Sequence, residues 1–107
     1  MELQKLIHRA MDLRHQYEKK ETQLYGSSST DEDIAKGFLG DVNNLVKLVQ
    51  AAHGKGQIAN SLEKIGPQLS HCLWSVIVLA EIYDVDLEHS FMETMDKLEN
   101  HLLETQE

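Results

Sequence analysis

The sequence has a single cysteine and a single proline among its 107 residues, and only six glycines. The lone cysteine, Cys72, excludes an internal disulfide framework and is typical of a reducing compartment. So little proline and glycine argues against long low-complexity tracts. The longest uninterrupted apolar run covers residues 76–80, far short of the ~20 residues that cross a bilayer. The first residues also lack the pattern of a secretion signal, so we expect a cytoplasmic protein.

Basic residues are scarce as well: 10 Lys and Arg stand against 18 Asp and Glu, which gives a formal net charge of −8. An acidic surface repels phosphate backbones and anionic lipids, so we expect neither duplex nucleic acid nor a membrane as a partner. A nucleotide stays a candidate ligand, because a bound divalent cation reverses the local charge. The length fits one domain over residues 1–107.

Apolar residues recur at helical spacing along the whole chain, and no stretch shows the alternation that is typical of a strand. Thr30 and Asp86 stand where the N-caps of helices are expected. The pattern therefore predicts an all-α fold. The expected helices span residues 2–24, 31–53, 58–65, 67–83 and 87–104.

Pro67 interrupts the most apolar part of the chain. A proline removes one backbone N–H and crowds the preceding turn, so either a helix kinks there or a new helix begins with Pro67 at its first position. We favour the new helix. The segment 67–83 is apolar on nearly every side, which predicts a buried central helix. A single bundle of this length offers too little surface to cover it, so we expect a homodimer or a dimer of dimers.

Some polar residues lie on faces that are otherwise apolar. Asp41 falls inside the apolar arc of its helix, and Asn44 lies beside it at the edge of that arc. Gln68, His71 and Ser75 form a row on the central helix. A carboxylate that faces a core is costly unless it is paired or bound to a metal, so we expect the two sets to meet. They form either a functional site or a structural polar layer.

Two stretches of the sequence resemble the motif helices of MazG-type nucleotide pyrophosphohydrolases. Residues 37–48 (GFLGDVNNLVKL) resemble the first motif, E-E-x-x-E, and residues 68–80 (QLSHCLWSVIVLA) resemble the second, E-x-x-D. Residues 82–88 (IYDVDLE) are similar to the family's turn into its last helix. The resemblance spans roughly residues 3–104 and implies a MazG-like bundle of four to five helices. It also implies hydrolysis of a nucleoside triphosphate to the monophosphate and pyrophosphate, with Mg²⁺ held by carboxylates.

This chain departs from the family at three of the four expected carboxylate positions. The best register places Phe38 and Asp41 on the E-x-x-E pair of the first motif. It places Gln68 and His71 on the later E-x-x-D. An amide brings no formal charge to a hard cation, and neutral imidazole is a poor Mg²⁺ ligand. We therefore expect a pyrophosphohydrolase activity that is weak, metal-shifted or lost, with a non-catalytic nucleotide- or protein-binding module as the alternative.

The candidate site is correspondingly small. Residual catalysis would depend on Asp41, Asn44, Gln68 and His71. Asp41 and His71 are the candidate ligands of a divalent cation, Mg²⁺ or Mn²⁺, with weak or absent binding expected. Lys47 and Lys97 are candidate contacts for nucleotide phosphates. Lys64 would lie near the former metal position if the two central segments formed one helix, and it would then oppose cation binding.

Overall fold

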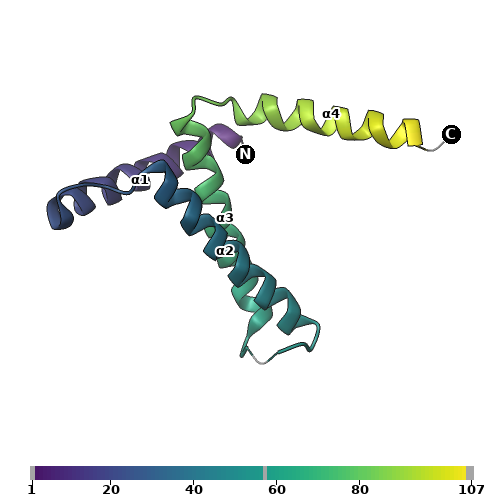
Figure 1. Ribbon diagram of the computed structural model, residues 1–107, viewed down its shortest axis with the longest axis horizontal. Coiled ribbons are helices and arrows are strands. Elements are labelled where there is room, and N and C mark those ends of the chain that lie inside the picture. The colour runs from purple at the N-terminus through teal and green to yellow at the C-terminus, as the bar shows by residue number, and fades with distance from the viewer. Residues whose placement is uncertain (1, 57, 106–107) are drawn as a thin grey trace.

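The computed structural model describes residues 2–56 and 58–105, and all the regular structure within them is α-helical. Four helices follow one another along the chain, as Figure 1 shows. The predicted all-α fold is therefore confirmed, with boundaries close to those expected for every helix except the central one. The helices are α1 (Leu3–Tyr25), α2 (Asp31–Ala52), α3 (Ser61–Ile82) and α4 (Leu87–Thr105).

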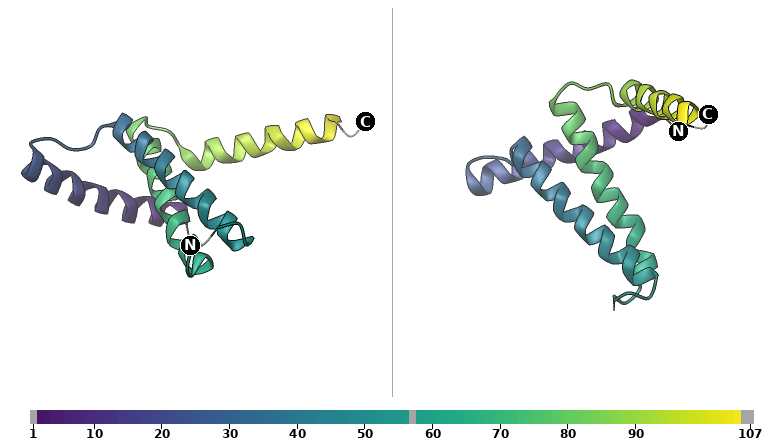
Figure 2. Two further views of the ribbon diagram at one scale, coloured as in Figure 1. Left: turned by 60° about the horizontal axis from the view of Figure 1, so that its bottom comes forward. Right: turned by 45° about the vertical axis from the view of Figure 1, so that its right-hand side comes forward.

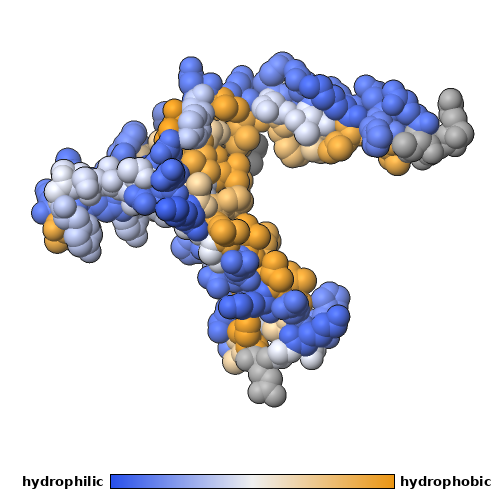
Figure 3. Space-filling view, viewed as in Figure 1, coloured by the Kyte–Doolittle hydropathy of each residue, from blue (hydrophilic) through white to orange (hydrophobic). Residues whose placement is uncertain are grey.

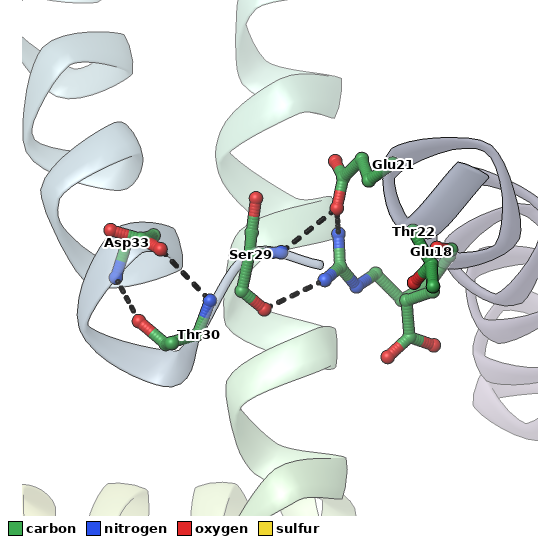
Figure 4. A network of polar contacts seen from close by, with 7 residues as sticks. Glu18, Glu21, Thr22, Ser29, Thr30 and Asp33 are labelled. Atoms are coloured by element: carbon green, nitrogen blue, oxygen red, sulfur yellow. Dashed lines mark hydrogen bonds and ion pairs between the residues drawn. The ribbon is translucent and has the colours of Figure 1, made fainter. Parts of the chain in front are cut away.

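The start of α2 is fixed by its own side chains (Figure 4). Thr30 Oγ1 accepts a hydrogen bond from the Asp33 N–H at 3.2 Å, and the Asp33 carboxylate accepts one from the Thr30 N–H at 3.0 Å. This capping box satisfies backbone groups that have no partner within the helix. Asp86 caps α4 in a similar way, since its Oδ1 accepts from the His89 N–H at 3.1 Å. Both predicted caps are confirmed.

Arg14 ties α1 to the beginning of α2 and is only 7% exposed. Its Nη2 donates to the Ser29 carbonyl at 3.0 Å, and its Nη1 lies 3.8 Å from Glu21 Oε1. The same Glu21 oxygen accepts from the Ser29 N–H at 2.9 Å, so the three residues form one network (Figure 4). A buried guanidinium needs partners of this kind, and here the partners also hold the chain between the two helices.

Pro67 lies inside α3, so the prediction that a new helix begins at this proline is wrong. The preceding residue is Gly66, which has no Cβ to clash with the proline ring, and the usual crowding before a proline is therefore reduced. α2 also packs along α3, and Gln68, directly after the proline, donates a hydrogen bond to Asp41 of α2. As a result, Lys64, Gln68 and His71 share one face of a single helix.

The helices are arranged as a long hairpin with two branches. α2 and α3 run side by side and antiparallel in all three views (Figures 1 and 2). α1 crosses α3 and contacts it near the end that lies away from the α2–α3 loop. α4 leaves the end of α3 at a wide angle and makes only sparse contacts with the other helices.

The core lies along α3 but covers only part of it. The buried apolar residues are Leu48 of α2 and Ile77, Val78 and Ala80 of α3. Leu73, in the middle of α3, remains 44% exposed. Ile82, near the end of α3, is 45% exposed. The expectation of a buried central helix is therefore wrong for most of α3 within a single chain, and it holds only around residues 77–80.

The surface of the chain is large for its mass. It exposes 8425 Å², whereas a compact monomer of 12.2 kDa exposes about 6,100 Å². The radius of gyration is 17.3 Å, against about 13 Å for a compact domain of this length. The molecule is an open frame of helices whose apolar faces are only partly covered.

Among the described residues, α3 is the one helix that is long and apolar enough to cross a membrane, by length and composition alone. The core helix of a soluble protein meets the same criterion. In this fold the apolar residues of α3 supply most of the core, since Ile77, Val78 and Ala80 all belong to it. Only 11% of that apolar window is buried within the chain, so packing inside one chain covers a small part of α3.

Candidate functional site

A polar contact joins α2 and α3 near the middle of the hairpin. Gln68 Nε2 on α3 donates a hydrogen bond to Asp41 Oδ1 on α2 at 3.2 Å, across 27 residues of sequence. Both side chains are half-buried. The expected meeting of Asp41 with the polar row of the central helix therefore occurs, and one carboxylate oxygen is occupied by an amide donor from this chain.

A cavity of about 400 Å³ opens beside this contact, between α2 and the first half of α3. Three of the four predicted catalytic residues, Asn44, Gln68 and His71, lie in its wall. The fourth, Asp41, is not part of the lining but is hydrogen-bonded to Gln68. The volume is within the range of small-molecule sites in proteins. The lining residues are Asn44, Lys47, Leu48, Ile58, Glu63, Lys64, Pro67, Gln68 and His71.

Lys64 is in the wall because α3 continues through Pro67. Lys47 faces the same space from α2, so two ammonium groups from facing helices border the cavity. Glu63 is the only acidic residue in the lining. The local charge is thus neutral to positive in a chain whose formal net charge is −8.

Lys97, the second predicted phosphate contact, is not brought to this cavity. It lies on α4, where its Nζ is 3.4 Å from Glu93 Oε1, one helical turn away. Both side chains are exposed. Within one chain the structure therefore groups Lys47 with the site residues and leaves Lys97 apart.

The donors at the cavity do not suit a hard divalent cation. Within residues 2–56 and 58–105, no three His, Cys, Asp or Glu side chains are grouped so that they could hold a metal ion together. Asp41 is the single carboxylate of the four motif positions, and it already accepts a hydrogen bond from Gln68. Mg²⁺ requires several oxygen ligands with negative charge, and the ammonium group of Lys64 would repel it.

A second polar link between α2 and α3 lies at the other end of the hairpin, and sequence reasoning missed it. Tyr83 Oη donates to Asp31 Oδ2 at 2.6 Å. This hydrogen bond lowers the pKa of Asp31, and it raises the pKa of Tyr83. Asp31 is the first residue of α2, and Tyr83 is the C-cap that follows α3. An antiparallel pairing of the two helices brings these positions together, so it was the signal that could have found the contact.

Trp74 on α3 is half-buried against α1. Trp74 Nε1 donates to the Ala10 carbonyl of α1 at 3.0 Å, and its ring centroid lies 5.7 Å from that of Tyr17. These contacts fix α1 against α3. Trp74 thus has partners within the chain and faces α1.

Comparison of the chain with protein-family models, with curated proteins and with solved structures finds no match. The assignment to the MazG family therefore stays a prediction from the sequence.

Proposed function

We propose that this chain is a MazG-like helical protein that binds the phosphates of a nucleotide directly and has lost robust cation-dependent hydrolysis. The observation that carries the proposal is the position of Lys64, which stands in the cavity wall one turn before Gln68 on a continuous α3. In this scheme the lysines replace the cation that the family's carboxylates hold. The protein would then be a nucleotide-binding module built on the frame of a hydrolase.

Electrostatics supports this exchange. A triphosphate needs positive charge near its oxygens, which either metal ions or basic side chains supply. Lys47 and Lys64 offer two ammonium groups from facing helices, and His71, one turn after Gln68 on α3, adds a third donor to the cavity wall. With Asp41 beside the cavity and Glu63 in its wall, the site has two carboxylates against two lysines, so it repels an unchelated phosphate less than four clustered carboxylates would.

The polar groups of the cavity match the remaining needs of a nucleotide. Asn44 and Gln68 carry amides that donate and accept hydrogen bonds, and Leu48, Ile58 and Pro67 give an apolar surface for a base or sugar. The lysines and His71 are exposed, so the ligand would be bound at an open site. We expect modest affinity that falls with ionic strength.

Calorimetric titration with ATP in EDTA tests the proposal. Wild-type protein should bind without any divalent cation, and Lys64→Ala should weaken binding about five- to tenfold, because one charge-assisted contact is lost. Lys19→Ala on α1, an exposed lysine away from the cavity, is the matched control and should leave binding unchanged. Binding that requires Mg²⁺, no binding at millimolar ATP, or equal weakening in the control variant would each contradict the proposal.

A pyrophosphate-release assay on the same samples separates this proposal from residual catalysis. With Mg²⁺, release from common nucleoside triphosphates should stay near the level of protein-free buffer. The competing reading is a metal-shifted enzyme in which Asp41 and His71 hold Mn²⁺. Mn²⁺-dependent release that Asp41→Ala abolishes would favour that enzyme over a binding module.

A further inference from the structure

α4 is an amphipathic helix whose apolar face has almost no support from its own chain. Phe91, Met95 and Leu98 recur at helical spacing on one side, and all three are exposed. The opposite side carries His89, whose Nε2 is 3.4 Å from Glu93 Oε2. Figure 3 shows the hydrophobic side of α4 facing the open corner between α4 and the α2–α3 pair. We call the face formed by residues 91, 95 and 98 the α4 ridge.

An apolar groove lies between α1 and α3 of the same chain. Its volume is about 520 Å³. Leu73 and Tyr17 in its wall are 44% and 47% exposed, and the Tyr17–Trp74 contact holds the two helices at the spacing that forms it. Leu69, exposed one turn before Leu73 on α3, extends the apolar surface beyond the groove. We call this the α1–α3 groove; its lining is Leu6, Arg9, Ala10, Leu13, Tyr17, Pro67, Ser70, His71, Leu73, Trp74 and Ile77.

We propose that the α4 ridge of one chain packs into the α1–α3 groove of a second copy, and that the second copy returns the same contact. Each chain carries both a ridge and a groove. In a dimer with two-fold symmetry, the ridge of each chain contacts the groove of the other, and these two identical contacts make a closed assembly. Only four residues, 83–86, connect α3 to α4, and α4 extends away from α1, one of the two helices that form the groove (Figure 1).

The exposed area fits a second copy of this chain. Each chain exposes roughly 2,300 Å² more than a compact monomer of its mass. Two such excesses together fall within the 2,000–5,000 Å² or so that obligate homodimers bury. The ridge and the groove are both hydrophobic, as the interfaces of such dimers are.

The charges beside the two surfaces are also complementary. Arg9 lies in the wall of the groove. Glu88 and Glu99 stand on α4 at positions that flank the ridge on one side, by the helical period. A second copy would therefore bring acidic side chains toward a basic one, which favours this pairing over contacts of like charge.

Light scattering after gel filtration at micromolar concentration gives the first test. The wild-type chain should show the mass of a dimer or of a dimer of dimers. Met95→Glu in the ridge and Leu73→Glu in the groove should each reduce that mass by half or more, while circular dichroism remains helical. Leu24→Glu, a change at an exposed leucine near the end of α1, is the control and should keep the wild-type mass. A monomeric wild type, or a mass that either interface variant leaves unchanged, would overturn the proposal.

Mixing two variants distinguishes exchange between copies from an α4 that folds back on its own chain. Chains with Met95→Glu and chains with Leu73→Lys should each fail to form the homodimer. Their mixture should form heterodimers, because one ridge–groove contact is then fully wild type and the other places a glutamate near a lysine. Native mass spectrometry resolves the three species. A mixture that contains no heterodimer while both variants are helical would overturn the reciprocal arrangement.

Discussion

α2 and α4 are amphipathic helices of similar length, 22 and 19 residues, yet α2 packs against α3 and α4 makes only sparse contacts with the other helices. α2 lies against α3 and contributes Leu48, which is 6% exposed, to the core. α4 shows Phe91 to solvent at 57% exposure. The spacing of apolar residues in a helix therefore determines which face can be buried. Whether that face is buried within one chain depends on whether another helix of the same chain packs against it.

The largest difference in stability between α2 and α4 should appear when one apolar side chain is truncated in each helix. Leu48→Ala should lower the free energy of unfolding by about 3 kcal/mol, because it leaves a cavity between α2 and α3. Met95→Ala should matter only while a second copy covers α4, so its effect should shrink when the protein is diluted. Urea unfolding followed by circular dichroism at two protein concentrations measures both. An equal loss for Met95→Ala in dilute solution would show that α4 packs on its own chain.

The smallest expected effect on stability concerns the hydrogen bond between Tyr83 and Asp31, which links α2 and α3 at the end of the hairpin opposite the cavity. The pKa of Asp31 is lowered, so its contribution to stability is present above the unfolded value of 3.8 and is lost as the pH falls through the folded pKa. The pKa of Tyr83 is raised, so its contribution is present below the unfolded value of 10.0 and is lost as the pH rises through the folded pKa.

Tyr83→Phe should therefore reduce the melting temperature slightly near pH 7, and this difference from the wild type should disappear at both extremes of pH. The effect should be small because both groups are exposed to solvent. Thermal melts of the two proteins across the pH range provide the measurement. A difference that is independent of pH would mean that the ring of Tyr83, and not its hydroxyl, stabilises the hairpin.

Much of the fold could be predicted from local patterns. Thr30 and Asp86 have side chains that cap a helix through neighbouring residues, so their role is visible in the sequence alone. The prediction at Pro67 was wrong for two reasons. Gly66 has no side chain to clash with the proline ring, and packing against α2 stabilises the continuous helix. The packing is a tertiary effect that the local sequence does not show. The burial of Arg14 was invisible for the same reason, since its partner Ser29 lies 15 residues away.

The candidate site could be predicted in part. The contact between Asp41 and Gln68 follows from the pairing of two polar positions on facing helices. The role of Lys64 could not be decided from the sequence, because it depended on whether one helix or two pass through Pro67. Lys97 was grouped with the site from its charge alone, and no local pattern could show that α4 would leave the hairpin.

The central claim is that the cavity occupies the former position of a four-carboxylate metal site, and restoring the carboxylates tests this most directly. The variant combines Phe38→Glu, Gln68→Glu and His71→Asp with Lys64→Ala, which removes the competing ammonium group. Four carboxylates close together repel one another, so the variant should be less stable than the wild type in EDTA.

Its melting temperature should be measured in EDTA and then with Mg²⁺ or Mn²⁺ at a hundredfold excess over Kd. A cation bound only by the folded state adds about 2.7 kcal/mol, which should raise the melting temperature on the order of 10 °C in a domain of this size. The wild-type chain should respond little to Mg²⁺. A variant that is folded and melts at the same temperature with and without either cation would show that the four positions do not converge, and would contradict the account.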